Sequence, residues 1–133
     1  MTRIKITCVL LVLFFFTGIV QAAFNVKVFE PKQVGQKAVI KLTMKNTFTE
    51  KIESARAQVF LLDDKGKVVG QVTKWVIGGT KDKPALTADA ETTFNFGVSM
   101  DKPFTTNKVT FTRLILEGGK VVDVNQNVQI VTN

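Results

Sequence analysis

Apolar and polar residues alternate along two segments of this chain. In residues 38–45 the even positions are apolar, whereas Lys41 and Lys45 stand among the odd ones. In residues 92–99, Phe94 and Phe96 alternate with polar neighbours in the same way. A period of two is the side-chain period of a β-strand and not of a helix. The pattern therefore predicts two half-buried strands.

Two other regions have the form of β-hairpins. An apolar run at 59–62 enters a polar turn at 63–67, which contains glycine, and then Val68 and Val69. Residues 109–117 and 120–124 flank Gly118-Gly119. Two adjacent glycines supply the positive φ angles of a tight turn, so we expect a two-residue loop there.

Three further segments complete the expected strand order. Residues 24–30 form a first strand, and another begins at about Ser54 and runs into the 59–62 segment. The alternation slips at residues 125–127, which indicates a β-bulge or short break, and resumes at Val128. About seven strands with turns roughly every 8 to 12 residues predict an all-β fold, an immunoglobulin-like antiparallel β-sandwich. A small barrel is the alternative.

The N-terminal residues have the features of a signal peptide. Arg3 and Lys5 precede an apolar run at 6–20, and Ala22 and Ala23 supply small residues for cleavage after one or the other. The run is shorter than the ~20 residues that span a bilayer. We therefore expect residues 1–22 to be removed, leaving one domain at 23–133 without a transmembrane segment. That domain is expected to be exported, either periplasmic or extracellular.

The residue inventory argues against most catalytic chemistry. The chain has no histidine, and its single cysteine, Cys8, lies in the leader. Catalysis by Ser-His-Asp or Cys-His and the usual zinc and copper ligands are thereby excluded from the mature domain. Met44 and Met100 are its two thioethers, and Met44 has the parity of a core residue. We expect no enzyme activity, cofactor or metal.

The central hairpin resembles a known family. Phe60, Leu62 and the pair Asp63-Asp64 resemble the Phe-x-Leu-Tyr-Asp signature of the FxLYD-type bacterial domains, with Asp63 where that family has tyrosine. The likeness covers residues 41–70 and implies an immunoglobulin-like fold on an envelope or secreted protein. It carries over no catalytic residue.

Three lysines are the strongest candidates for contact with a partner. Lys37, Lys41 and Lys45 share one parity on a single strand, so they project from one face about 13 Å apart. Removal of Arg3 and Lys5 leaves 16 basic against 11 acidic residues, a net charge of +5. The lysine row is suited to an anionic envelope polymer or to lipid headgroups. The competing interpretation is that it keeps a strand soluble and protects a sheet edge.

Aromatic residues give a weaker prediction. Phe48 and Phe104 lie in polar turn contexts and are expected to be exposed, where they would form a contact patch if both lie at one end. Trp75, the only tryptophan, is expected in the core. Export and the lack of an exposed aromatic series argue against nucleic acid as the partner.

Three functions remain open. The first is a non-catalytic module that binds or scaffolds an envelope protein or anionic polymer. The second is a subunit or accessory of a surface fibre that uses strand addition. The third is a carboxylate-dependent hydrolase, which needs two carboxylates across a groove and predicts that Asp63, Asp64, Asp89 or Glu91 converge there, the candidate pairs being Asp63-Asp64 and Asp89 with Glu91. Turn capping and solvent exposure are the structural alternatives for those carboxylates.

Overall fold

The computed structural model describes residues 23–80 and 83–132, which form a β protein with one very short helix. The elements are β1 (Phe24–Val28), β2 (Lys32–Val34), β3 (Lys37–Asn46), β4 (Ile52–Leu62), β5 (Val68–Ile77), β6 (Glu91–Ser99), β7 (Thr106–Leu116), β8 (Lys120–Val121), α2 (Val124–Asn127) and β9 (Val128–Thr132). The all-β prediction is confirmed. The described part has nine strands and not about seven, and four of them, β1, β2, β8 and β9, are only two to five residues long.

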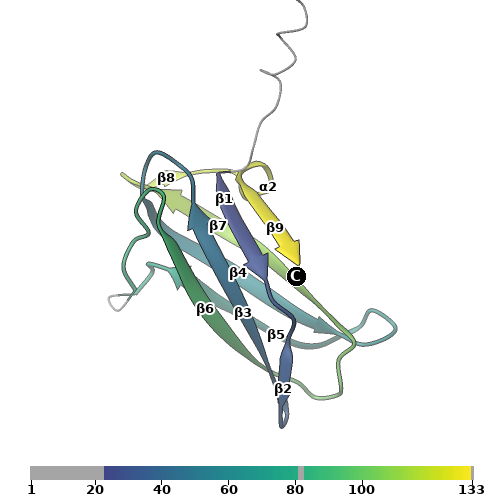
Figure 1. Cartoon of the computed structure of the whole chain (residues 1–133). Helices are drawn as coiled ribbons and strands as arrows, with labels where there is room; N and C mark the ends of the chain where they lie inside the picture. The colour runs from purple at the N-terminus through teal and green to yellow at the C-terminus, as the bar shows by residue number, and fades with distance from the viewer. Residues whose placement is uncertain (1–22, 81–82, 133) are drawn as a thin grey trace, which may run out of the picture.

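The strands form two sheets (Figure 1). In the first, β3 pairs with β6 on one side and with β1 and β2 on the other, and β9 adds to β1 in parallel. The second has the order β5-β4-β7-β8 and is antiparallel. Both described sheets are open and share no strand, which contradicts the small-barrel alternative.

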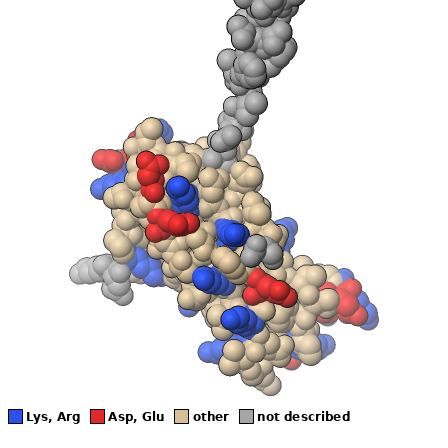
Figure 2. Space-filling model, viewed as in Figure 1, with Lys and Arg blue, Asp and Glu red and all other residues tan. Residues whose placement is uncertain are grey.

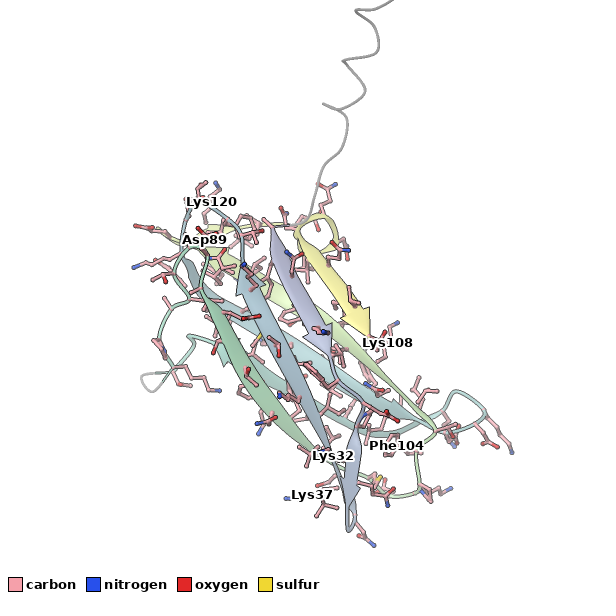
Figure 3. The ribbon with its side chains drawn as sticks, in the orientation of Figure 1. Lys32, Lys37, Asp89, Phe104, Lys108 and Lys120 are labelled. Carbon is pink, nitrogen blue, oxygen red and sulfur yellow. The ribbon has the colours of Figure 1, made fainter. Side chains whose placement is uncertain are left out.

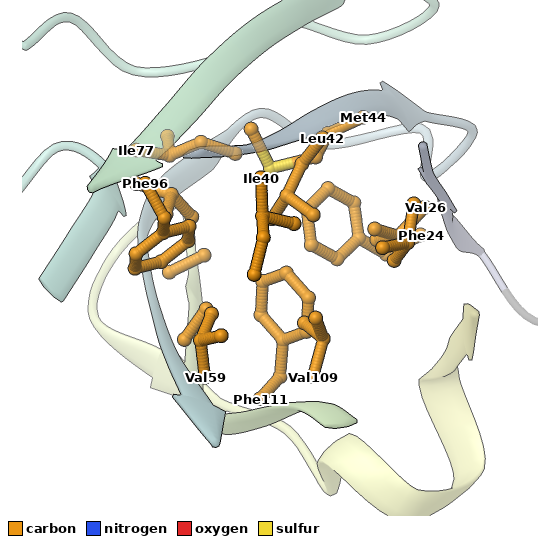
Figure 4. Packing of buried hydrophobic residues seen from close by; sticks show 14 of the residues in the cluster. Phe24, Val26, Ile40, Leu42, Met44, Val59, Ile77, Phe96, Val109 and Phe111 are labelled. Atoms are coloured by element: carbon orange, nitrogen blue, oxygen red, sulfur yellow. The ribbon is translucent and has the colours of Figure 1, made fainter. Parts of the chain in front are cut away.

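The core lies between the two sheets (Figure 4). Along β3, alternate residues from Ala38 to Asn46 are buried and the intervening ones are exposed or half-buried, as the period of two predicts. β6 repeats this rule at Phe96 and Val98. The rings of Phe24 and Phe111 connect the sheets edge to face, with centroids 5.3 Å apart. Met44 is fully buried, which confirms its predicted place in the core.

The turn between β4 and β5 is held by one aspartate. The Oδ1 atom of Asp63 accepts hydrogen bonds from the backbone N–H groups of Lys65 and Lys67, both at 2.8 Å. These two bonds lower the pKa of the Asp63 carboxyl, with Lys67 contributing most. Gly66 closes the turn with a φ of 81°. The predicted hairpin and the turn-capping role of Asp63 are confirmed.

The β7–β8 hairpin differs in detail from its prediction. Gly118 and Gly119 have φ angles of 82° and 79°, as expected. However, Leu116 pairs with Lys120, so the loop has three residues, Glu117 being the first. β8 also ends at Val121 and not at residue 124.

The chain changes sheets after β8. The predicted break at 125–127 is the helical turn α2, whose N-cap, Asp123, accepts a hydrogen bond from the backbone N–H of Asn125. Beyond it, β9 leaves the β7 sheet and pairs with β1. Within the described ranges, no helix is long and apolar enough to cross a membrane. The predicted signal peptide lies outside the described residues.

Candidate functional site

The outer face of the first sheet is the candidate site. Its strands place five exposed lysines on the same side, away from the core; we call this set the lysine face, and it comprises Lys27, Lys32, Lys37, Lys41 and Lys45. Register fixes this arrangement, because Lys27 is opposite Thr43 and Lys32 is opposite Val39. Directly opposed residues of neighbouring strands lie on the same face of a sheet.

The three predicted lysines do form a row on one face of β3, and the structure contradicts edge protection as its purpose, whereas a role in keeping the strand soluble stays a prediction. Lys37, Lys41 and Lys45 are exposed on β3, as their parity requires. β3 has paired strands on both sides, so these lysines cannot protect an edge. Figure 2, which views this face, shows basic side chains along its length with acidic ones between them.

A break between β1 and β2 brings an aromatic ring into the lysine face. The pairing of β1 and β2 with β3 differs by one residue in register, which places residues 29–31 in a bulge. The N–H of Phe29 still donates to the Lys41 carbonyl at 3.0 Å. The half-buried ring lies 4.9 Å from Lys41 Nζ and 5.5 Å from Lys27 Nζ, so two ammonium groups converge on it.

Two open hollows flank this cluster. One, of about 500 Å³, is lined by Phe29, Lys32, Lys41 and Asn95 together with Glu30 and Val39. The other, of about 330 Å³, lies between Lys27 and Lys45 and is also lined by Glu91 and Val131. Lys27 lines the smaller hollow, and Lys41 and Phe29 line the larger one.

The lysines of the lysine face form no ion pairs in the described structure. Within residues 23–80 and 83–132, none of its five ammonium groups lies within ion-pair distance of a carboxylate; the ion pair found there joins Lys120 to Glu50 at 3.4 Å. Glu91 is opposite Lys45 in the pairing of β6 with β3 but forms no ion pair with it. An extended anion could neutralise several of these charges at once.

The two predicted contact phenylalanines do not form a shared patch. Phe48 follows β3 and Phe104 follows β6, and these strands are antiparallel, so the two residues lie at opposite ends of the sheet. Figure 3 shows Phe104 near the end that carries Lys32 and Lys37. Both rings are half-buried and pack against the core. Polar neighbours in the sequence did not reveal this packing.

The prediction for Trp75 is also wrong. Its side chain is half-buried and its residue pairs with Arg56 of β4. The guanidinium carbon lies 5.4 Å from the indole centroid, and Arg56 Nε donates to Thr112 Oγ1 at 3.0 Å. Because Arg56 and Thr112 lie on the outer side of the β4–β7 pair, the tryptophan covers the outer face of the second sheet and not the core.

The two carboxylate pairs considered for hydrolysis lie at opposite ends of the fold, and Asp64, Asp89 and Glu91 are exposed to solvent. Glu91 begins β6, and Ser99 ends it about 26 Å away. The Asp63-Asp64 turn lies near the Ser99 end, where Asp101 N donates to Val69 of the adjoining β5 strand. Asp89 lies at the Glu91 end (Figure 3). The described residues also contain no group of three or more Asp, Glu, His or Cys placed to hold a metal ion.

Comparison with known proteins gives likeness of fold alone. No protein-family model and no curated protein matches the chain. Among solved structures, the structural-genomics target SoR45 is similar at a TM-score of 0.59 and 16% identity, over 78% of this chain and 81% of that one. A candidate ApaA protein from Bordetella pertussis gives 0.55 and 19%, over 78% and 89%. IrmA from Escherichia coli gives 0.50 and 11%, over 83% and 92%.

Proposed function

We propose that this protein is a non-catalytic, exported binding module whose lysine face holds an anionic polymer of the cell envelope. The observation that carries the proposal is the set of five exposed lysines, without ion-pair partners in the described structure, around the half-buried ring of Phe29. Export rests on the predicted leader.

The spacing of the charges favours a polymer over a small anion. Successive lysines of β3 stand about 13 Å apart, and the row covers most of the strand. A single phosphate or sulfate group cannot contact two such lysines at once, whereas a chain with repeated negative charges can lie along the row. Phe29 adds an apolar surface at the middle of the face.

The fold fits an immunoglobulin-like module. β6, β3 and β1 pack against β5, β4 and β7, an arrangement of two open sheets that supports an immunoglobulin-like sandwich. The likeness of Phe60, Leu62 and Asp63-Asp64 to the FxLYD signature agrees with such a fold, and the antiparallel β4–β5 hairpin bears these residues, with a register shift between Leu61 and Leu62. Scaffolds of this kind carry function on faces and loops.

The test measures binding of residues 23–133 to dextran sulfate at two salt concentrations. Near an anionic surface each lysine contributes roughly 1 kcal/mol. Changing Lys27, Lys41 and Lys45 together to Gln should therefore lower affinity roughly a hundredfold at low salt. Binding by the unchanged protein should weaken steeply as the NaCl concentration rises from about 50 to about 300 mM. Salt at the higher concentration screens the attraction between the lysines and the polymer more strongly.

The matched control removes three positive charges elsewhere. Lys65 and Lys67 lie in the β4–β5 turn and Lys108 lies on β7, and all three are exposed. Changing these three to Gln lowers the net charge equally but should reduce affinity only a few-fold. Equal losses in the two triple variants would mean that net charge alone drives binding, and the proposal would be rejected.

A further inference from the structure

The second sheet ends early on the side of β7. β8 pairs only with Ile115 and Leu116 of β7, followed by one more hydrogen bond from Val122 N to the Leu114 carbonyl at 3.1 Å. Figure 1 shows β8 reaching one end of β7 only. Within the described chain, residues 106–113 of β7 have β4 on one side and no strand on the other. This open edge is about 26 Å long.

The open edge adjoins a hollow between the two sheets that is lined by both apolar and polar atoms. The hollow has a volume of about 190 Å³ and is lined by Val109 and Phe111 of β7, Val128 and Ile130 of β9, and Val124 and Asn125 of α2, with Thr110. Ile130 is 38% exposed, which is high for a large apolar residue on the inner side of a strand. Because β9 has joined the other sheet, no described strand covers these side chains from the β7 side.

We propose that the open edge of β7 accepts an added strand from another protein, an extended segment with alternating apolar and acidic side chains. Backbone N–H and C=O groups along residues 106–113 would pair with the backbone of that segment. Its apolar side chains would enter the hollow between Phe111 and Ile130. This surface is separate from the lysine face, and the inference does not depend on the proposed polymer binding.

The charges of the open edge favour this acidic segment over a second copy of the chain. The charged residues of the open edge, Lys108 and Arg113, are both basic and exposed. Antiparallel pairing of two such edges would place Lys108 of one copy within two residues of Arg113 of the other. Like charges on neighbouring strands destabilise their pairing, whereas acidic side chains at alternate positions would be attracted by both.

The probe is a synthetic ten-residue peptide that alternates Val or Ile with Glu, added to residues 23–133. The readout is amide hydrogen exchange followed by NMR. Binding should slow exchange at least about tenfold at alternate residues of 106–113, because ladder pairing protects every second amide on an edge. The amides of the β5 and β6 edges should not change. The same peptide with one central residue replaced by Pro should give no protection, since Pro lacks an N–H group.

Two substitutions on β9 provide the matched control. Ile130→Lys places a charge in the hollow and should weaken peptide binding at least about tenfold. Val131→Lys alters the adjacent residue, which is 50% exposed and faces the opposite side of the strand, and should leave binding unchanged. Absence of β7 protection at saturating peptide, protection at β5 or β6 instead, or equal effects of both substitutions would overturn the proposal. Concentration-dependent dimers with protected β7 amides would identify a second copy as the occupant and would equally overturn it.

Discussion

Asn46 shows how one buried polar side chain can join three segments. It is fully buried at the end of β3. Its Nδ2 donates to the carbonyls of Glu50 and Leu86, at 3.0 and 2.9 Å, and its Oδ1 accepts from Phe48 N at 2.8 Å. The turn after β3 and the loop before β6 are therefore held at the same end of the fold.

Replacing Asn46 by Ala should be strongly destabilising. The substitution removes hydrogen bonds from three backbone groups, all in buried or part-buried settings, and leaves the Leu86 carbonyl with only its bond from Ile52 N. Loss of partners for buried polar groups costs about 2 to 4 kcal/mol in total. Urea unfolding should show this decrease in the free energy of unfolding. Asn95→Ala, on the exposed side of β6, should change it by less than about 0.5 kcal/mol. Comparable losses in both variants would refute the assigned role of Asn46.

Asp63 should make stability sensitive to acid. The hydrogen bonds from Lys67 N and Lys65 N lower the pKa of its carboxyl in the folded state relative to the unfolded state. The resulting stabilisation is present above the unfolded-state pKa and is lost as pH falls through the folded-state pKa. Thermal unfolding from pH 6 to pH 2, a range of about four units around an ordinary carboxyl pKa, should show a smaller decline for Asp63→Asn than for the unchanged protein. A decline in Asp63→Asn as steep as that of the unchanged protein would contradict this assignment.

The local sequence pattern predicts where a strand lies but not which other strand it pairs with. Val122, Val124, Val128 and Ile130 keep one parity through the break, so the pattern indicates which side faces the core. It contains no information on the sheet that a strand joins. β9 pairs in parallel with β1, about 100 residues earlier in the chain, and that choice depends on long-range packing.

The positive φ angles of the β7–β8 loop should make the free energy of unfolding sensitive to replacement of its glycines. A Cβ atom at Gly118 would have no neighbour within 4 Å, so Gly118→Ala tests the φ of 82° alone. An L-residue in this conformation costs about 1 kcal/mol. Gly97 of β6 also has open space around a Cβ position but no positive φ. Gly97→Ala should therefore be neutral or stabilising in the same chemical denaturation, and equal losses in both variants would contradict the conformational explanation.

The candidate site combines residues that local pattern could and could not identify. Parity along one strand was sufficient for Lys37, Lys41 and Lys45. Lys27, Lys32 and Phe29 come from β1, β2 and the bulge between them, and they join the face only through their register with β3. Register across strands is a tertiary property, so sequence analysis found the row but not the cluster around the ring.

Both proposed surfaces depend on one shared core, since buried side chains of the two sheets pack in a single cluster. Leu42 of β3 is fully buried in that cluster, so Leu42→Ala should lower the free energy of unfolding by about 2 to 5 kcal/mol. Trp75 is the only tryptophan and the chain has no tyrosine, so fluorescence reports β5 of the other sheet, whereas far-ultraviolet circular dichroism reports all strands.

The two signals should shift to the same lower urea midpoint in Leu42→Ala, because a cooperative unit of this size unfolds in one transition. Thr43→Ala, the adjacent residue on the outer side of β3, should shift both midpoints far less. If the fluorescence midpoint stayed at its original value while the dichroism midpoint moved, the sheets would unfold separately. The lysine face and the open edge of β7 would then belong to independent units, and a change in the stability of one would leave the other intact.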